Sequence, residues 1–101
     1  MNRIINNKKY DTKTAKEISC YRYGDYGDWF GIEEKLYLKK TGEFFLYAWG
    51  GAHSKYGEQC GNHTWSDASH IFPYTVDEAK EWAMEHMSGD KYEEVFGPVE
   101  E

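Results

Sequence analysis

The chain has 101 residues, of which 40% are hydrophobic, 30% charged and 18% aromatic. This length and balance predict a single globular domain over residues 1–101 and exclude wholesale disorder. The longest apolar run, residues 44–49, is far too short to cross a membrane, and residues 1–10 lack the apolar core of a signal peptide. We therefore expect a cytoplasmic protein with no membrane partner.

The negative charge is concentrated at one end of the chain. The formal net charge of −6 arises from residues 74–101, which carry nine acidic residues against two lysines. An acidic surface repels phosphate, so this composition argues against direct binding of nucleic acid. It suits a basic protein partner, although acidic residues on helices also serve solubility alone.

Short extended segments and turns open the chain. Residues 4–10 form two extended pieces around an Asn-Asn turn. Asp11 or Thr12 can cap a brief helix through residues 15–17. Residues 18–23 then alternate in the manner of a strand.

The clearest predicted element is a β-hairpin. Residues 34–39 and 43–49 flank a Lys-Thr-Gly turn in which Gly42 can take the left-handed conformation. One face of the first strand is leucine-rich, and both faces of the second are apolar or aromatic. Residues 24–28 before it have the composition of a loop. We expect a small antiparallel sheet of about three strands.

Helices are predicted at the C-terminal end. Thr75 and Glu78 have the spacing of a capping box, and the helix runs to about Met87 with Trp82 on its apolar stripe. Three glutamates flank this stripe toward solvent: Glu78, Glu81 and Glu85. A second, short helix covers residues 90–96. The expected fold class is α+β, with a short N-terminal helix and C-terminal helices packed on the sheet.

Residues 50–70 resemble a long connection rich in Gly, Ser, Asn and His, and such loops are functional or held by something other than packing. Cys60 and His63 have the spacing of a short metal knuckle, and thiolate with imidazole favours a structural zinc ion. Further ligands would come from among His53, Cys20 and His70, with His53 and Cys20 preferred. The alternative is that these are ordinary loop residues. A disulfide between the two cysteines is not expected in a reducing cytosol.

Catalytic motifs are weak in this sequence. It has no Gly-rich phosphate loop and no nucleophile elbow, and the carboxylates of Glu33 and Glu34 are merely adjacent. Cys60 and His63 are too close in the chain for a known thiol-nucleophile arrangement. We therefore expect a binding protein and not an enzyme, with a small hydrolase as the remaining catalytic alternative.

Several segments carry a resemblance to one group of proteins. They are residues 5–15, 36–47, 50–51, 54–56, 65–66, 78–83, 85–86 and 92–97. Together these segments resemble small orphan proteins of phages and mobile elements of Gram-positive bacteria, a group that includes anti-CRISPR proteins directed against the type II effector nuclease. The resemblance spans nearly the whole chain and implies an inhibitor, without indicating which residues bind.

The charge pattern suits that role. The type II nuclease holds its guide–DNA heteroduplex in a positively charged channel, which an acidic protein can obstruct sterically and electrostatically. The expected binding surface includes the three helical glutamates, and the expected location is the host bacterial cytoplasm. The alternative function is a non-inhibitory adaptor or regulatory protein that binds another partner through its aromatic and acidic surface.

Overall fold

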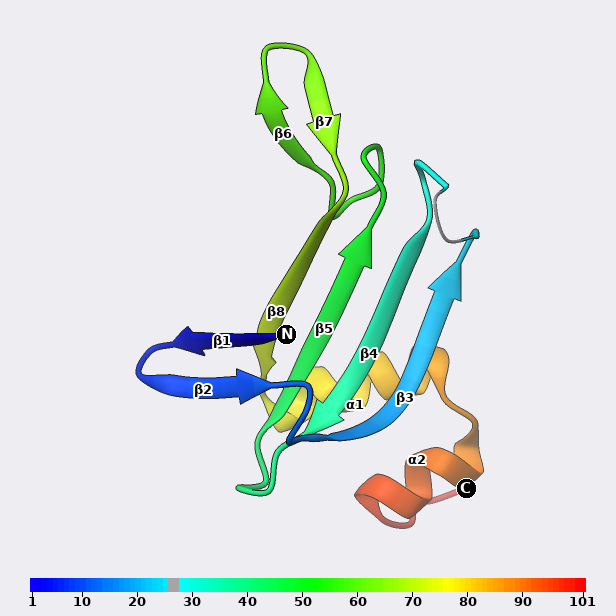
Figure 1. The fold of residues 1–101 in the computed structure, drawn as a ribbon. Coiled ribbons are helices and arrows are strands. Elements are labelled where there is room, and N and C mark those ends of the chain that lie inside the picture. The colour runs from blue at the N-terminus through cyan, green and yellow to red at the C-terminus, as the bar shows by residue number, and fades with distance from the viewer. Residues whose placement is uncertain (26–27) are drawn as a thin grey trace.

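The computed structural model describes residues 1–25 and 28–101. Over these residues the elements are β1 (Asn2–Ile5), β2 (Lys8–Asp11), β3 (Lys16–Tyr23), β4 (Ile32–Leu38), β5 (Phe44–Gly50), β6 (Glu58–Gly61), β7 (Thr64–Ser66), β8 (Ala68–Tyr74), α1 (Val76–His86) and α2 (Gly89–Phe96). The described strands form an antiparallel sheet in the order β3-β4-β5-β8 and two separate hairpins, β1–β2 and β6–β7. Figure 1 shows α1 behind this sheet and the β1–β2 hairpin in front of it. The α+β class is confirmed.

The β4–β5 hairpin forms the centre of the sheet, as the alternating pattern predicts. Leu36 of β4 lies opposite Leu46 of β5. The Lys39 amide donates to the Glu43 carbonyl at 2.8 Å to close the turn. Gly42 has a φ of 93°, a conformation that glycine adopts without a steric penalty.

The helix-facing core is built around α1. The Glu78 amide donates to the Thr75 hydroxyl at 3.1 Å, and the Thr75 amide donates to the Glu78 carboxylate at 2.9 Å, so the predicted capping box is present. Trp82 of α1 is buried against the sheet with Leu36 and Leu46, which are almost fully buried. The predicted place of Trp82 in the core is confirmed.

The second helix begins slightly earlier than its sequence suggests. Ser88 is the N-cap, because its side chain accepts a hydrogen bond from the Lys91 amide at 3.2 Å, and Asp90 lies in the first turn. Val95 and Phe96 pack against the edge of the helix-facing core. This helix therefore lies at the margin of the fold.

The other face of the sheet is covered at one end by the β1–β2 hairpin. Its turn places Asn6 and Asn7 at φ values of 51° and 63°, which confirms the predicted Asn-Asn turn. Tyr10 of β2 meets the ring of Phe45 edge-on at 5.6 Å, and Tyr37 stacks on Phe45 at 5.1 Å. This second core explains why β5 carries apolar side chains on both faces.

The predicted short N-terminal helix is wrong. In the described segment between β2 and β3, the Ala15 amide donates to the Asp11 carbonyl at 3.1 Å, which makes one isolated turn. The Asp11 carboxylate accepts from the Lys13 amide at 2.9 Å and so stabilises this turn. A single turn is too short to propagate as a helix, and Lys16 already pairs with Leu38 of β4.

Residues 50–70 contain more regular structure than a long connection. Within the described residues, β6 and β7 form a hairpin, and β8 begins at Ala68 and pairs with β5. The expectation of about three strands is corrected to four, since β8 joins the main sheet. The predicted loop at residues 24–28 includes residues 26 and 27, which lie outside the described residues.

Candidate functional site

A buried carboxylate connects the sheet, a loop and α1. Glu34 lies on β4 on the same face as Leu36, and it is only 3% exposed. The Trp82 indole donates to Glu34 Oε1 at 2.9 Å, and the Tyr56 hydroxyl donates to Oε2. The Lys55 ammonium lies 3.3 Å from Oε2. Both carboxylate oxygens therefore accept hydrogen bonds from other parts of the chain.

The protonation states around Glu34 follow from these contacts. Burial alone would raise the pKa of Glu34, but the hydrogen bonds from Tyr56 and Trp82 and the charge of Lys55 outweigh it, so this pKa lies below its ordinary value. Burial, and then the hydrogen bond to the Glu34 carboxylate, raise the pKa of Tyr56 well above the ordinary value. Glu34 is therefore ionised and Tyr56 is a neutral donor at neutral pH.

The loop over residues 51–57 aims Tyr56 at this carboxylate. The Ser54 hydroxyl donates to the Gly51 carbonyl at 2.8 Å and accepts from the Tyr56 amide at 3.2 Å. A side chain at Gly51 would collide with the carbonyls of Asp28 and Trp29, so only glycine allows this close approach. The loop is thus fixed by its own hydrogen bonds and by Glu34.

His86 occupies the remaining side of the cluster. Its ring stacks on Tyr21 with centroids 4.0 Å apart, and it lies 4.9 Å from the Trp82 ring. His86 Nε2 is 3.8 Å from Glu34 Oε1. The sequence places this histidine on the apolar stripe of α1, and the structure packs it there between aromatic rings.

A groove opens above the cluster. One part, of about 240 Å³, lies beside α1, and a larger part, of about 620 Å³, lies beside β8. Both parts are lined by Lys55, Tyr56, Tyr74 and Glu78, so they adjoin. The groove thus has aromatic walls and an acidic rim.

The three predicted partner-binding glutamates all lie on this groove. Glu78, Glu81 and Glu85 are exposed and line the part beside α1. Burial raises the pKa of Tyr74, and the charges of Glu34, Glu78 and Glu85 raise it further, which indicates a negative potential in the groove. Glu78 also caps α1, so its carboxylate has a structural role that the other two lack.

The preferred zinc ligands Cys60 and His63 share the β6–β7 hairpin, whereas His53 and Cys20 lie on other segments. Cys60 is exposed on β6, and His63 occupies the β6–β7 turn at a φ of 61°. His53 lies in the 51–57 loop against the rings of Trp29 and Phe30. Cys20 is exposed on β3, where partial burial and then the Glu33 carboxylate raise the pKa of its thiol.

The fourth-ligand alternative, His70, also has other contacts. His70 Nε2 lies 3.0 Å from the Tyr56 carbonyl oxygen. Among the described residues, no group of three or more His, Cys, Asp or Glu is placed to hold a metal ion. The zinc site stays a prediction that rests on the spacing of Cys60 and His63.

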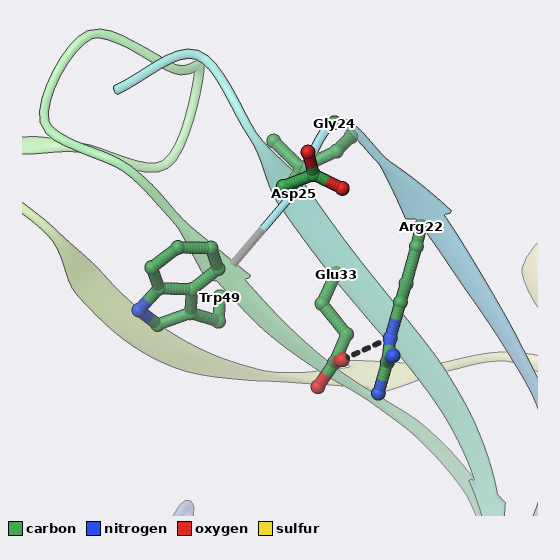
Figure 2. A pocket seen from close by; sticks show the side chains of 6 residues that line it. Arg22, Gly24, Asp25, Glu33 and Trp49 are labelled. Carbon is green, nitrogen blue, oxygen red and sulfur yellow. Dashed lines mark hydrogen bonds and ion pairs between the residues drawn. The ribbon is translucent and has the colours of Figure 1, made fainter. Parts of the chain in front are cut away.

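A second hollow, of about 330 Å³, lies on the sheet face opposite the helices. Figure 2 shows Arg22, Glu33 and Trp49, which come from β3, β4 and β5. The Arg22 guanidinium donates to the Glu33 carboxylate at 2.6 Å, and the Trp49 indole donates to Asp67 at 3.1 Å. Arg22 and Glu33 therefore neutralise each other here, in contrast to the acidic groove.

Comparisons with known proteins identify no relative. No family model, no curated protein and no solved structure matches this chain. None of the described helices is long and apolar enough to span a membrane.

The sequence predicts that Trp82 is buried on α1, but it does not predict the contacts of Trp82 and Tyr56 with Glu34. The sequence does indicate that Glu34 faces the core, because Glu34 alternates in phase with Leu36 along the strand. A buried carboxylate needs donors, but Tyr56 and Trp82 are distant in the chain and neither belongs to a recognisable motif. The predicted glutamates and the unpredicted cluster together form the candidate site.

Proposed function

We propose that this chain binds and inhibits the RNA-guided effector nuclease of type II CRISPR systems. One observation supports it above the others: the exposed carboxylates of Glu78, Glu81 and Glu85 border an aromatic groove. The combination suits a basic protein surface, because charges steer association while buried aromatic contacts prolong the complex. The sequence resemblance to phage-borne orphan proteins points to the same target.

The proposed mechanism is obstruction by binding. The nuclease channel is positively charged because it holds a nucleic-acid heteroduplex, so it attracts an acidic domain and is blocked by it. This mechanism requires no turnover, no cofactor and no direct contact between the chain and nucleic acid. It would operate in the host bacterial cytoplasm, where the nuclease acts.

Cleavage by purified nuclease tests the proposal. The nuclease is loaded with guide RNA and mixed with increasing amounts of the chain before target DNA is added. We expect cleavage to fall to background near equimolar inhibitor, and the chain to be captured with the nuclease in a pulldown. A restriction endonuclease on the same DNA is the control, and its cleavage should be unchanged.

The other outcomes are equally informative. Absence of both capture and inhibition would contradict the proposal and is the result that the adaptor alternative predicts. Capture without loss of cleavage would contradict inhibition by obstruction. Loss of restriction cleavage as well would show that the chain acts on the DNA, contrary to the obstruction mechanism.

A further inference from the structure

We propose that the groove between α1, β8 and the 51–57 loop binds an arginine- or lysine-bearing segment of a protein partner. This inference rests on the proposed function only for the identity of the protein that carries the segment. The walls of the groove, its charges and the position of one of the chain's own lysines support it independently of that function.

Aromatic rings form the walls of the groove. Tyr56, His70 and Phe72 line its larger part, with ring centroids 5.7 Å apart for His70 and Phe72 and 6.0 Å apart for Tyr56 and Phe72. Tyr74 borders both parts. The faces of the tyrosine and phenylalanine rings attract ammonium and guanidinium groups, and guanidinium also stacks on them.

Charge in the groove is strongly one-sided. The carboxylates that line it are those of Glu34, Glu58, Glu78, Glu81 and Glu85, whereas Lys55 supplies the ammonium. The described elements that pack around the groove therefore leave a surplus of negative charge. A cationic side chain complements this surface, and a phosphate group is repelled by it.

Lys55 shows how a cation fits. Its ammonium lies 3.3 Å from the Glu34 carboxylate and 5.0 Å from the centre of the Tyr56 ring. Its side chain is nevertheless 63% exposed, so its ammonium can be released to water when an incoming cation replaces it beside Glu34. An incoming arginine or lysine would take this position between carboxylate and ring, and Lys55 would be displaced.

Size and rim position favour a protein segment over a free small cation. The two adjoining parts, of about 240 and 620 Å³, offer more room than one side chain fills. Glu81 and Glu85 stand along α1 and can meet a second basic residue of the same segment. An extended basic peptide engages both parts at once, which a single amino acid cannot do.

Peptide titration followed by NMR tests the inference without the nuclease. The probes are hexa-arginine and hexalysine, with hexaglutamine as the neutral control, at low salt. We expect shifts of the Trp82 indole resonance and of backbone amides in residues 55–57, 70–72, 74 and 78–86. Lys55→Met removes the internal cation and should tighten hexa-arginine binding about threefold or more.

Matched variants separate the groove from general acidity. Lys80→Met makes the same charge change on α1, at a residue that does not line the groove, and should alter affinity far less than Lys55→Met. Glu85→Gln should weaken binding several-fold, whereas Glu94→Gln on α2 should not. If Lys55→Met fails to fold, the comparison of Glu85→Gln with Glu94→Gln still tests the inference.

Defined outcomes overturn the inference. The inference is contradicted if neither basic peptide binds, or if Lys55→Met and Lys80→Met change peptide affinity equally. If Lys55→Met does not fold, equal changes in affinity for Glu85→Gln and Glu94→Gln contradict it. Binding of spermine as tightly as hexa-arginine would likewise contradict a site built for a protein segment. Peptide binding in the groove together with an uninhibited nuclease would remove the proposed function and leave this inference standing.

Discussion

Two neighbouring segments between β5 and β8 are held in different ways. The 51–57 loop is tied to the interior through Tyr56, whose hydroxyl reaches the buried Glu34. The β6–β7 hairpin is exposed along almost its whole length and pairs only with itself within the described sheets. Figure 1 shows this hairpin projecting beyond the end of the main sheet. Side-chain contacts with the interior and backbone hydrogen bonds to Trp29 and Gly31 fix the first segment. Pairing between its own two strands fixes the second.

The 51–57 loop and the β6–β7 hairpin have similar compositions, so the sequence predicts one long loop for both although their structures differ. Both segments are rich in glycine and polar residues, which suggests a long loop in need of a clip. The 51–57 loop is held by its contact with the Glu34 carboxylate. The β6–β7 hairpin is ordered by the backbone hydrogen bonds between its two strands. A lone hairpin of two strands is only marginally stable, so we expect the two halves to respond very differently to mutation.

The largest loss of stability is expected in the Glu34 cluster that holds the 51–57 loop. Trp82→Ala removes a buried ring and one of the donors to Glu34, which should cost about 3–5 kcal/mol of unfolding free energy. Chemical denaturation measures this directly. A variant as stable as the parent would show that the cluster does not hold the fold together.

Tyr56→Phe tests the loop clip with little change in shape. Loss of the hydroxyl leaves Glu34 Oε2 with one donor fewer, and we expect a cost of about 1–3 kcal/mol. The control is Tyr23→Phe on the exposed end of β3, which should be nearly neutral. Equal effects of the two substitutions would contradict the role of Tyr56.

The same cluster predicts a pH dependence. The pKa of Glu34 is lower in the folded than in the unfolded state, so its contribution is fully present above the unfolded pKa. That contribution is lost as pH falls below about 4 and through the folded value. Unfolding free energies measured from pH 7 to pH 3 should fall less steeply for Tyr56→Phe than for the parent. Parallel curves would contradict the linkage.

Local patterns predicted much of this fold. The β4–β5 hairpin, the Asn-Asn turn and the Thr75 capping box each depend on residues adjacent in sequence, and all three are confirmed. The site was harder, because Glu34 and Trp82 are separated by 48 positions and meet only when α1 folds onto the sheet. Contacts of that kind are set by tertiary packing and leave no local signature.

The same limit explains the errors. Asp11 does cap a turn, but pairing of Lys16 with Leu38 of β4 competes with helix growth and wins. The sequence does not predict the start of β8, because Ser69 and His70 continue the polar composition of the preceding loop. In both places the deciding partner is a strand distant in sequence.

The smallest change in stability is expected in the β6–β7 hairpin. Cys60 is exposed on β6, so Cys60→Ser should change stability by less than about 0.5 kcal/mol. The zinc prediction requires the opposite result, with about one zinc per chain that is lost together with stability in this variant. Elemental analysis of protein purified without a metal-affinity tag, with melting curves in chelator, decides between them.

The most direct test of the account is the rate at which the chain associates with guide-loaded nuclease at several salt concentrations. Glu81→Lys with Glu85→Lys spares the Glu78 cap and should slow association about tenfold at low salt and flatten its salt dependence. Glu94→Lys with Glu100→Lys makes the same charge change at exposed positions outside the groove and should have a much smaller effect. Equal rates for the two variants would contradict a binding surface on α1.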